Sequence, residues 1–227
     1  MARARLNRPL LLGHRGARAR KAIPENTLPS FDQALADGCD GFEFDLRLTA
    51  DGVAVVCHDP KFDGVEIASA TSRELRKLPH LESVLGPYRD RAFLDIELKV
   101  NGLEEKTASR LGENPPTRGF VVSSFLPEVL EAMHALDPKI PLGLICETRA
   151  ELRAWSRTSV EYVMPHYKLV DSVLLRELKG AGKKVVVWTV NRSSDMCHFC
   201  DLGVDGIISD DTRLLCETLG GSRLRGD

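Results

Sequence analysis

Charged residues alternate with apolar ones in two short segments of the chain. Glu43 and Asp45 take every second position of the first segment, and Asp95, Glu97 and Lys99 do so in the second. Because alternate residues of a β-strand point to one face, each set shares one side of its strand. Carboxylates that are buried together repel one another and lose their hydration, so they need a cation. Oxygen ligands of this kind suit a hard divalent ion, Mg²⁺ or Ca²⁺.

These residues also allow an interpretation without a metal. Inside a layered core, Lys99 alone could pair with the acids. The inward carboxylates outnumber the one inward lysine, however, and this imbalance favours a bound cation over a purely structural cluster.

His14 and Arg15 follow an apolar segment that starts at Leu10, and Gly13 and Gly16 flank them. Alternation puts the histidine on the same face as the leucines of that segment, which predicts that its ring faces the interior. The glycines permit a tight turn and a close approach of the backbone to a ligand. The planar guanidinium suits a phosphate group. The alternative is a surface loop with two solvated bases.

A second histidine returns to the acidic residues through a predicted β-hairpin. The Asp51-Gly52 pair lies between alternating apolar residues, which indicates a two-residue hairpin loop. In the register of that loop, His58 lies opposite Asp45.

Two imidazoles, a guanidinium, an ammonium and a bound cation would together suit an anionic phosphodiester. The cation and the guanidinium would neutralise the nonbridging oxygens. One histidine would take the proton of the attacking hydroxyl, and the other would protonate the leaving alkoxide. Histidine suits both roles because its ordinary pKa lies near 6.5.

Composition excludes several other classes of function. The 227 residues carry a net charge of −2, which offers no basic surface for nucleic acid. No apolar stretch approaches the length of a membrane span, and the N-terminal apolar run is too short for a secretory signal. The six cysteines form no dense framework, so we expect reduced thiols and a cytoplasmic location.

Short apolar segments alternate with helical patterns along the whole chain, and this order defines the expected fold. The expected strands are Leu10–Gly13, Gly41–Leu46, Ala92–Lys99, Gly119–Ser123, Pro141–Ile145, Tyr162–Met164, Lys184–Val190 and Gly206–Ser209. Eight such βα units predict an α/β fold of the (β/α)8 TIM-barrel type, in one domain over residues 1–227. The β-hairpin would extend the second strand, followed by a short cap insertion. The alternative, an open doubly wound sheet, lacks the glycine-rich turn after its first strand.

The sequence resembles glycerophosphodiester phosphodiesterases over nearly its whole length. The motifs that carry this resemblance are His14-Arg15-Gly16, Pro24-Glu25-Asn26-Thr27, Glu43-Phe44-Asp45, Asp51-Gly52 with His58-Asp59, Glu97-Leu98-Lys99, Ser123-Ser124-Phe125, Trp188-Thr189-Val190-Asn191 and Asp205-Gly206-Ile207-Ile208-Ser209-Asp210. Each motif is weak alone, but eight in the family's order are specific. The family has a (β/α)8 barrel and uses a divalent metal to hydrolyse glycerophosphodiesters to glycerol 3-phosphate and an alcohol. In the scheme that this resemblance implies, the glycerol hydroxyl of the substrate attacks first and gives a cyclic phosphate, which water then opens.

The resemblance also implies roles for individual residues. It implies His14 and His58 as the acid–base pair, Glu43, Asp45 and Glu97 as metal ligands, Arg15 and Lys99 as phosphate contacts, Trp188 as an apolar wall for glycerol, and Glu25 and Asn26 as supporting residues. The expected partner is a small phosphodiester. For Trp188 the alternative is an ordinary core position.

One segment departs from the family pattern. Residues Pro60–Leu78 are compressed where the family has a longer cap, which predicts a more open mouth. A lysophospholipid would then also fit, so a lysophospholipase D or a cyclising phospholipase-type enzyme is an alternative function. A third alternative is a barrel that binds phosphate esters without turning them over.

Overall fold

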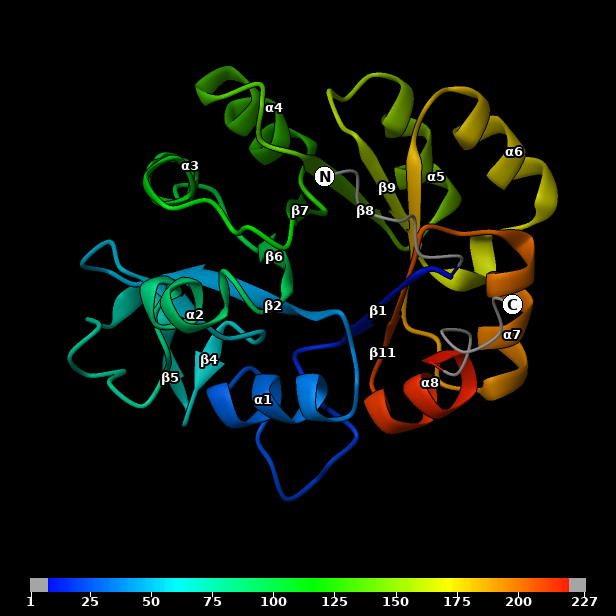
Figure 1. Cartoon of the computed structure of the whole chain (residues 1–227). Coiled ribbons are helices and arrows are strands. Elements are labelled where there is room, and N and C mark those ends of the chain that lie inside the picture. Colours follow the sequence, from blue (N-terminus) through cyan, green and yellow to red (C-terminus); the bar gives the residue numbers. More distant parts are fainter. Residues whose placement is uncertain (1–7, 221–227) are drawn as a thin grey trace.

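The computed structural model describes residues 8–220, whose strands form a closed barrel (Figure 1). Its eight parallel strands are β1 Leu10–Gly13, β2 Gly41–Leu48, β6 Phe93–Leu98, β7 Phe120–Ser124, β8 Leu142–Cys146, β9 Tyr162–Pro165, β10 Lys184–Val187 and β11 Gly206–Ser209. Strand β1 pairs with both β2 and β11, and this double pairing closes the barrel. The predicted (β/α)8 fold is therefore confirmed, and the open-sheet alternative is wrong.

The helices lie outside the barrel, where Figure 1 shows them around the strands. They are α1 Leu28–Ala36, α2 Leu81–Tyr88, α3 Glu104–Glu113, α4 Pro127–Leu136, α5 Arg149–Leu152, α6 Ser172–Gly180, α7 Ser193–Leu202 and α8 Thr212–Leu219, with short 3-10 helices at Ile67–Ser69, Arg153–Ser156 and Tyr167–Leu169. Each α-helix follows a barrel strand, so the loops that leave the carboxyl ends of the strands all open at one end of the barrel.

Helix α1 shows how the sequence determines where a helix begins and ends and how it packs on a strand. The Thr27 side chain accepts a hydrogen bond from the Ser30 N–H and caps the first turn. Gly38 follows the helix with φ of 105°, a left-handed conformation that glycine adopts without strain. Between these ends, Phe31 stacks on Phe42 of β2 with ring centroids 4.2 Å apart. The capped helix is thereby fixed against the second strand.

The two faces of the strands carry different side chains. On β2, Phe42, Phe44 and Leu46 are buried beneath the helices, whereas Glu43 and Asp45 take the intervening positions. The barrel interior holds a separate apolar cluster of Leu12, Phe93, Val121, Ile145, Tyr162, Met164, Val186 and Ile208. The alternation in the sequence therefore predicted correctly which face each side chain takes.

The hairpin after β2 exists, but its loop is longer than the sequence predicts. Strand β3, Ala54–Val56, pairs with β2 in antiparallel register. The Thr49 N–H donates to the Val53 carbonyl, which leaves three loop residues. Gly52 has φ of 75°, and the Asp51 carboxylate accepts a hydrogen bond from the Thr49 hydroxyl. A three-residue loop with a left-handed glycine replaces the expected two-residue turn.

The longer loop shifts the register of the hairpin by one residue. The Cys57 N–H donates to the Asp45 carbonyl over 3.0 Å, so Cys57 and not His58 lies beside Asp45 in the ladder. The predicted opposition of His58 and Asp45 is wrong in this respect. His58 still reaches the same end of the barrel, because the chain beyond β3 turns over the ends of the strands.

A compact cap connects β3 to α2. It contains a small hairpin of β4, Lys61–Phe62, and β5, Val65–Glu66. Its buried side chains Ile67, Leu75 and Leu78 pack with Val55 and Cys57 of the first hairpin. The predicted short cap insertion therefore has a core of its own.

The remaining predicted strands agree with the observed bounds to within two residues, with one exception. The expected strand at residues 184–190 ends at Val187. Beyond it, the backbone keeps an isolated bridge between His166 and Trp188. At this position the indole N–H of Trp188 donates to the Met164 carbonyl, 2.7 Å away.

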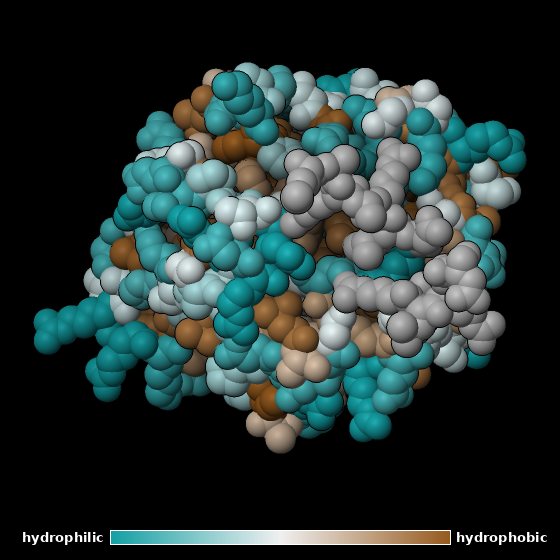
Figure 2. Space-filling model, in the orientation of Figure 1, coloured by the Kyte–Doolittle hydropathy of each residue, from teal (hydrophilic) through white to brown (hydrophobic). Residues whose placement is uncertain are grey.

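Hydrophilic side chains cover much of the face in Figure 2, with apolar patches between them. Within residues 8–220, none of the helices has the length and apolar character needed to cross a bilayer.

Candidate active site

A cavity of about 230 Å³ opens at the carboxyl ends of the barrel strands. Its lining combines acids, bases and apolar side chains, namely His14, Arg15, Glu43, His58, Asp95, Glu97, Lys99, Phe125, Ile145, Glu147, Met164, Trp188 and Ile208. This end of a (β/α)8 barrel is where the βα loops meet and where such folds carry out chemistry.

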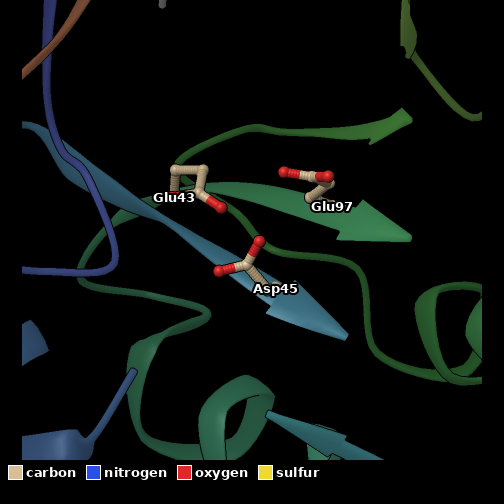
Figure 3. A group of neighbouring side chains, drawn as sticks. All are labelled: Glu43, Asp45 and Glu97. Atoms are coloured by element: carbon tan, nitrogen blue, oxygen red, sulfur yellow. The ribbon is translucent and has the colours of Figure 1, made fainter. Parts of the chain in front are cut away.

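Three carboxylates converge on one point in this cavity (Figure 3). Glu43 and Asp45 project from β2, and Glu97 projects from the neighbouring β6, where it is in register with Asp45. One oxygen from each of the three lies within 4.8 Å of the others, and all three residues are buried. Three buried carboxylate oxygens at this spacing can hold a hard divalent cation.

Two basic side chains neutralise part of this acidic cluster. Lys99 Nζ lies 2.7 Å from Glu97 Oε1 and 3.3 Å from Asp45 Oδ1. Arg15 Nε lies 3.3 Å from Asp45 Oδ2, and the Arg15 backbone N–H donates to Glu43 Oε2 over 2.9 Å. The pairing of Lys99 with the acids, which the sequence left as an alternative to a metal, is therefore present.

The positive charges do not balance the whole cluster. Glu43 Oε1 is buried and has no hydrogen-bond partner among the described residues. Burial, with the negative charges of Asp45 and Glu97, raises the pKa of Glu43 well above its usual value. Burial and the Asp45 charge likewise raise the pKa of Glu97. The cluster is short of positive charge, as expected for residues that bind a cation.

Asp95 lies deeper and has a different environment. The Ser123 hydroxyl donates to Asp95 Oδ1 over 2.6 Å, and the Asp95 side chain is fully buried. Burial is the main cause that raises its pKa to about 7. Asp95 lines the cavity, but its oxygens are not part of the group formed by Glu43, Asp45 and Glu97.

His14 is held from behind by the end of the last strand. Its Nδ1 lies 2.7 Å from Asp210 Oδ1, and its Nε2 lies 3.9 Å from Glu43 Oε2. Asp210 also accepts hydrogen bonds from Asn191 Nδ2 at 2.7 Å and from Arg18 Nη1 at 3.1 Å. These contacts direct Nε2 of His14 toward the acidic cluster.

His58 also lines the cavity and comes from the segment that follows strand β3 of the hairpin. Its Nδ1 is 2.8 Å from Asp59 Oδ1, and its backbone carbonyl accepts a hydrogen bond from Arg47 Nε. Burial lowers the pKa of His58 below its usual value, although Asp45 and Asp59 oppose this shift. The ring is therefore mainly neutral at neutral pH.

Glu25 and Asn26 occupy the supporting positions that the sequence suggested. Glu25 Oε1 accepts a hydrogen bond from Arg15 Nη1 over 2.6 Å, and its other oxygen accepts one from Arg18 Nε. Asn26 Nδ2 donates to Asp45 Oδ2 over 2.8 Å. One residue thus orients the guanidinium of Arg15, and the other orients a carboxylate of the cluster.

An apolar wall faces the acidic cluster. Trp188 and Phe125 pack edge to face with ring centroids 5.6 Å apart, and Met164 and Ile208 extend the same side of the cavity. The indole is fixed by its hydrogen bond to the Met164 carbonyl. Trp188 therefore lines the cavity, and it also packs against the apolar cluster of the barrel interior.

Sequence reasoning gave no role to several residues of this site. Asp210, Asn191 and Phe125 stand in the motifs quoted above, but their contacts depend on strands far apart in the chain. Arg18 and Glu147 lie outside those motifs. Besides those motifs, position was a signal, since Asp210 directly follows β11 at the carboxyl end of the barrel.

Over most of its length, this chain is similar to the members of one protein family. The model of the glycerophosphoryl diester phosphodiesterase family matches residues 14–105 and 76–214. A glycerophosphodiester phosphodiesterase from Caldanaerobacter subterraneus subsp. tengcongensis is 31% identical, over 91% of this chain and 96% of that protein.

Solved structures show the same fold. An Oleispira antarctica phosphodiesterase, solved in complex with the product sn-glycerol-3-phosphate, has a TM-score of 0.81 and 26% identity, covering 93% of this chain and 96% of its own. A glycerophosphodiester phosphodiesterase from Thermotoga maritima has a TM-score of 0.79 and 24% identity, covering 92% and 97%. Because one family model and a relative of this identity span most of the sequence, the chain belongs to the glycerophosphoryl diester phosphodiesterase family.

Proposed function

We propose that this phosphodiesterase hydrolyses glycerophosphodiesters to glycerol 3-phosphate and an alcohol, with His14 and His58 as its acid–base pair and a divalent cation as its cofactor. One observation carries the proposal: both histidines, two cationic side chains, and Glu43 and Glu97 of the acidic cluster line a single cavity, and Asp45 completes the cluster beside them. Family membership supports the reaction class.

The donor set fits a hard cation such as Mg²⁺ or Ca²⁺. Glu43, Asp45 and Glu97 would hold it, because they offer converging carboxylate oxygens and Glu43 Oε1 lacks a partner among the described residues. When bound, such an ion withdraws electron density from a phosphate oxygen. Arg15 and Lys99 add fixed positive charge for the remaining oxygens.

The two histidines take complementary parts in this proposal. His58 accepts the proton of the glycerol hydroxyl that attacks the phosphorus, because burial lowers the pKa of its ring and favours the neutral form. This step gives a cyclic phosphate and the alcohol, and water then opens the cyclic phosphate to glycerol 3-phosphate. His14 returns a proton to the leaving alkoxide, and the Asp210 carboxylate behind its ring compensates the positive charge of the protonated form. Trp188 and Phe125 exclude water from the side of the cavity that receives the glycerol carbons.

Enzyme assays test each part of the proposal. The full chain is incubated with glycerophosphocholine or glycerophosphoethanolamine, with and without chelator, and glycerol 3-phosphate is measured. We expect release that stops with chelator, returns with added Mg²⁺ or Ca²⁺, and is lost in His14→Ala and His58→Ala. Release that is insensitive to chelator would exclude the cation, and full activity in either variant would exclude that histidine. Binding without turnover across the diester panel would identify a non-catalytic barrel.

The five apolar residues of the lining favour a second candidate substrate. Phe125, Ile145, Met164, Trp188 and Ile208 offer more apolar surface than a bare glycerol group needs. A lysophospholipid would place its acylated glycerol there, and the reaction would be that of a lysophospholipase D. Phosphorus NMR of lysophosphatidylcholine reactions separates the products, since a persistent cyclic phosphate identifies a cyclising enzyme instead.

The proposed location of the protein is cytoplasmic. Its six cysteines do not form the dense framework that small secreted domains use, and this composition supports a reducing compartment.

A further inference from the structure

Two cysteines that are far apart in the chain meet on the side of the barrel away from the active site. Cys39 lies in the turn between α1 and β2, and Cys216 lies on α8. Their Sγ atoms are 3.6 Å apart, although 177 positions separate them in the sequence. The pair therefore joins the first and the last βα units of the barrel.

The surrounding contacts hold this pair in place. The Cys39 N–H donates to the Ala34 carbonyl over 3.1 Å, which fixes the turn after α1. The Thr212 hydroxyl donates to Asp37 Oδ2 over 2.6 Å and ties the start of α8 to that turn. A Cβ atom added at Gly38 would lie 3.7 Å from the Cβ and Sγ atoms of Cys216, so the turn passes close to the helix.

We propose that Cys39 and Cys216 form a reversible disulfide that clamps the last helix of the barrel onto the turn before β2. The two sulfurs must move about 1.5 Å closer to reach the bond length of a disulfide. The turn and the helix are held against each other by their own hydrogen bonds, so the side chains make this movement on a fixed backbone.

The two thiols differ in access, which sets the order of the reaction. Cys39 is buried, whereas Cys216 is partly exposed and lines a surface cavity of about 410 Å³ together with Arg20, Asp37 and Arg213. Its hydrogen bond with Cys39 lowers the pKa of Cys216 and raises that of Cys39. Cys216 is thus the thiol that meets an oxidant first.

A small disulfide such as glutathione disulfide supplies the oxidant. The Cys216 thiolate attacks one of its sulfurs and releases one glutathione thiolate. Cys39 then loses its proton to solvent and attacks the Cys216 sulfur of the mixed disulfide, which releases the second glutathione. In total, two protein thiols lose two electrons and two protons, and one glutathione disulfide becomes two glutathione molecules.

The Cys39–Cys216 disulfide would close a very long loop. It should therefore stabilise the folded protein, because it lowers the conformational entropy of the unfolded chain. We expect a rise in Tm of about 5–15 °C for a cross-link of this span in a chain of this size. Neither sulfur lines the catalytic cavity, so the stabilisation does not depend on the proposed enzymatic function.

The test uses the full chain, incubated with glutathione disulfide or with dithiothreitol. Unreacted thiols are alkylated after unfolding, and non-reducing peptide mapping by mass spectrometry identifies the linked peptides. We expect a Cys39–Cys216 peptide, a higher Tm in the oxidised sample and reversal of both by dithiothreitol. Full alkylation of Cys39 and Cys216 after oxidation would overturn the proposal, as would linkage of either one to a different cysteine.

Variants separate this pair from other thiols. Cys216→Ser should abolish the Tm gain, whereas Cys197→Ser, at an exposed thiol on α7, should keep it. Circular dichroism checks that each variant is folded, and Cys216→Ala replaces the first variant if serine is not tolerated. A Tm gain that persists without Cys216, or that disappears without Cys197, would contradict the assignment.

Discussion

Asp210 Oδ1 lies 2.7 Å from His14 Nδ1, and this contact links the last strand of the barrel to the first. Asp210 is mostly buried and holds its negative charge firmly, because the hydrogen bonds and charge of His14, Asn191 and Arg18 overcome the effect of burial and lower its pKa. The carboxylate fixes both the orientation of the ring and the nitrogen that carries its proton.

Asp210→Asn should therefore reduce kcat by about 10²–10⁴-fold with a smaller change in KM, because the substituted amide no longer stabilises the protonated ring. Steady-state kinetics with glycerophosphocholine measures both parameters. Asp63→Asn is the control, since Asp63 pairs with Lys77 in the cap and does not line the cavity. An Asp210→Asn enzyme with the kcat of the wild type would contradict the positioning role.

Metal binding can be tested without measuring activity. Without metal, Glu43→Gln removes a carboxyl group that burial and the neighbouring acids destabilise, so the free energy of unfolding of the variant should exceed that of the wild type by about 1–3 kcal/mol. Added Mg²⁺ or Ca²⁺ should raise the Tm of the wild type and leave the variant unchanged.

Thermal unfolding with and without each ion checks this expectation, and Glu105→Gln, at an exposed position of α3, serves as the control. A metal-free Glu43→Gln protein that is less stable than the wild type, or one that is stabilised equally by the ions, would show that Glu43 has a structural role instead.

Sequence alternation was enough to place the acidic cluster. The side chains of a strand alternate between two faces, so the positions of Glu43, Asp45 and Glu97 followed once the apolar residues between them were assigned to the outer face. The same reasoning placed His14 above Leu12 at the end of β1. These features are local, and a local pattern can predict them.

The features that were missed depend on contacts between distant residues. The hairpin register changed because Asp51 bonds to Thr49 and also accepts hydrogen bonds from Ser72, which fixes a three-residue loop. The contact between Asp210 and His14 exists because β1 and β11 close the barrel across nearly the whole chain. Neither the hairpin register nor the contact between Asp210 and His14 can be predicted from the spacing of residues that are close in the sequence.

The pH dependence of the reaction should report on His58. Burial lowers its pKa below the usual 6.5, and the neutral ring is the form that accepts a proton, so kcat/KM should fall only as the pH drops below that value. The Asp59 carboxylate opposes this shift. Asp59→Asn should therefore move the acidic limb of the pH profile to still lower pH.

Profiles of kcat/KM between pH 4.5 and 8 measure this limb for the wild type and for Asp59→Asn. Asp63→Asn, in the cap, is the control because Asp63 pairs with Lys77 and does not contact His58. Movement of the limb to higher pH in Asp59→Asn would mean that the limb belongs to another group.

The last prediction concerns substrate binding by the apolar side of the cavity, where Trp188 lies. Trp188→Ala should lower kcat/KM by about 10–100-fold, mainly through KM, because the indole covers one side of the cavity and excludes water there. Trp188→Phe should recover part of this loss, since it keeps an aromatic face but not the N–H that bonds to the Met164 carbonyl. The matched control is Trp155→Ala, because the second tryptophan packs against the outer core and does not line the cavity. If both alanine variants changed only Tm and left KM alone, Trp188 would serve packing rather than substrate binding.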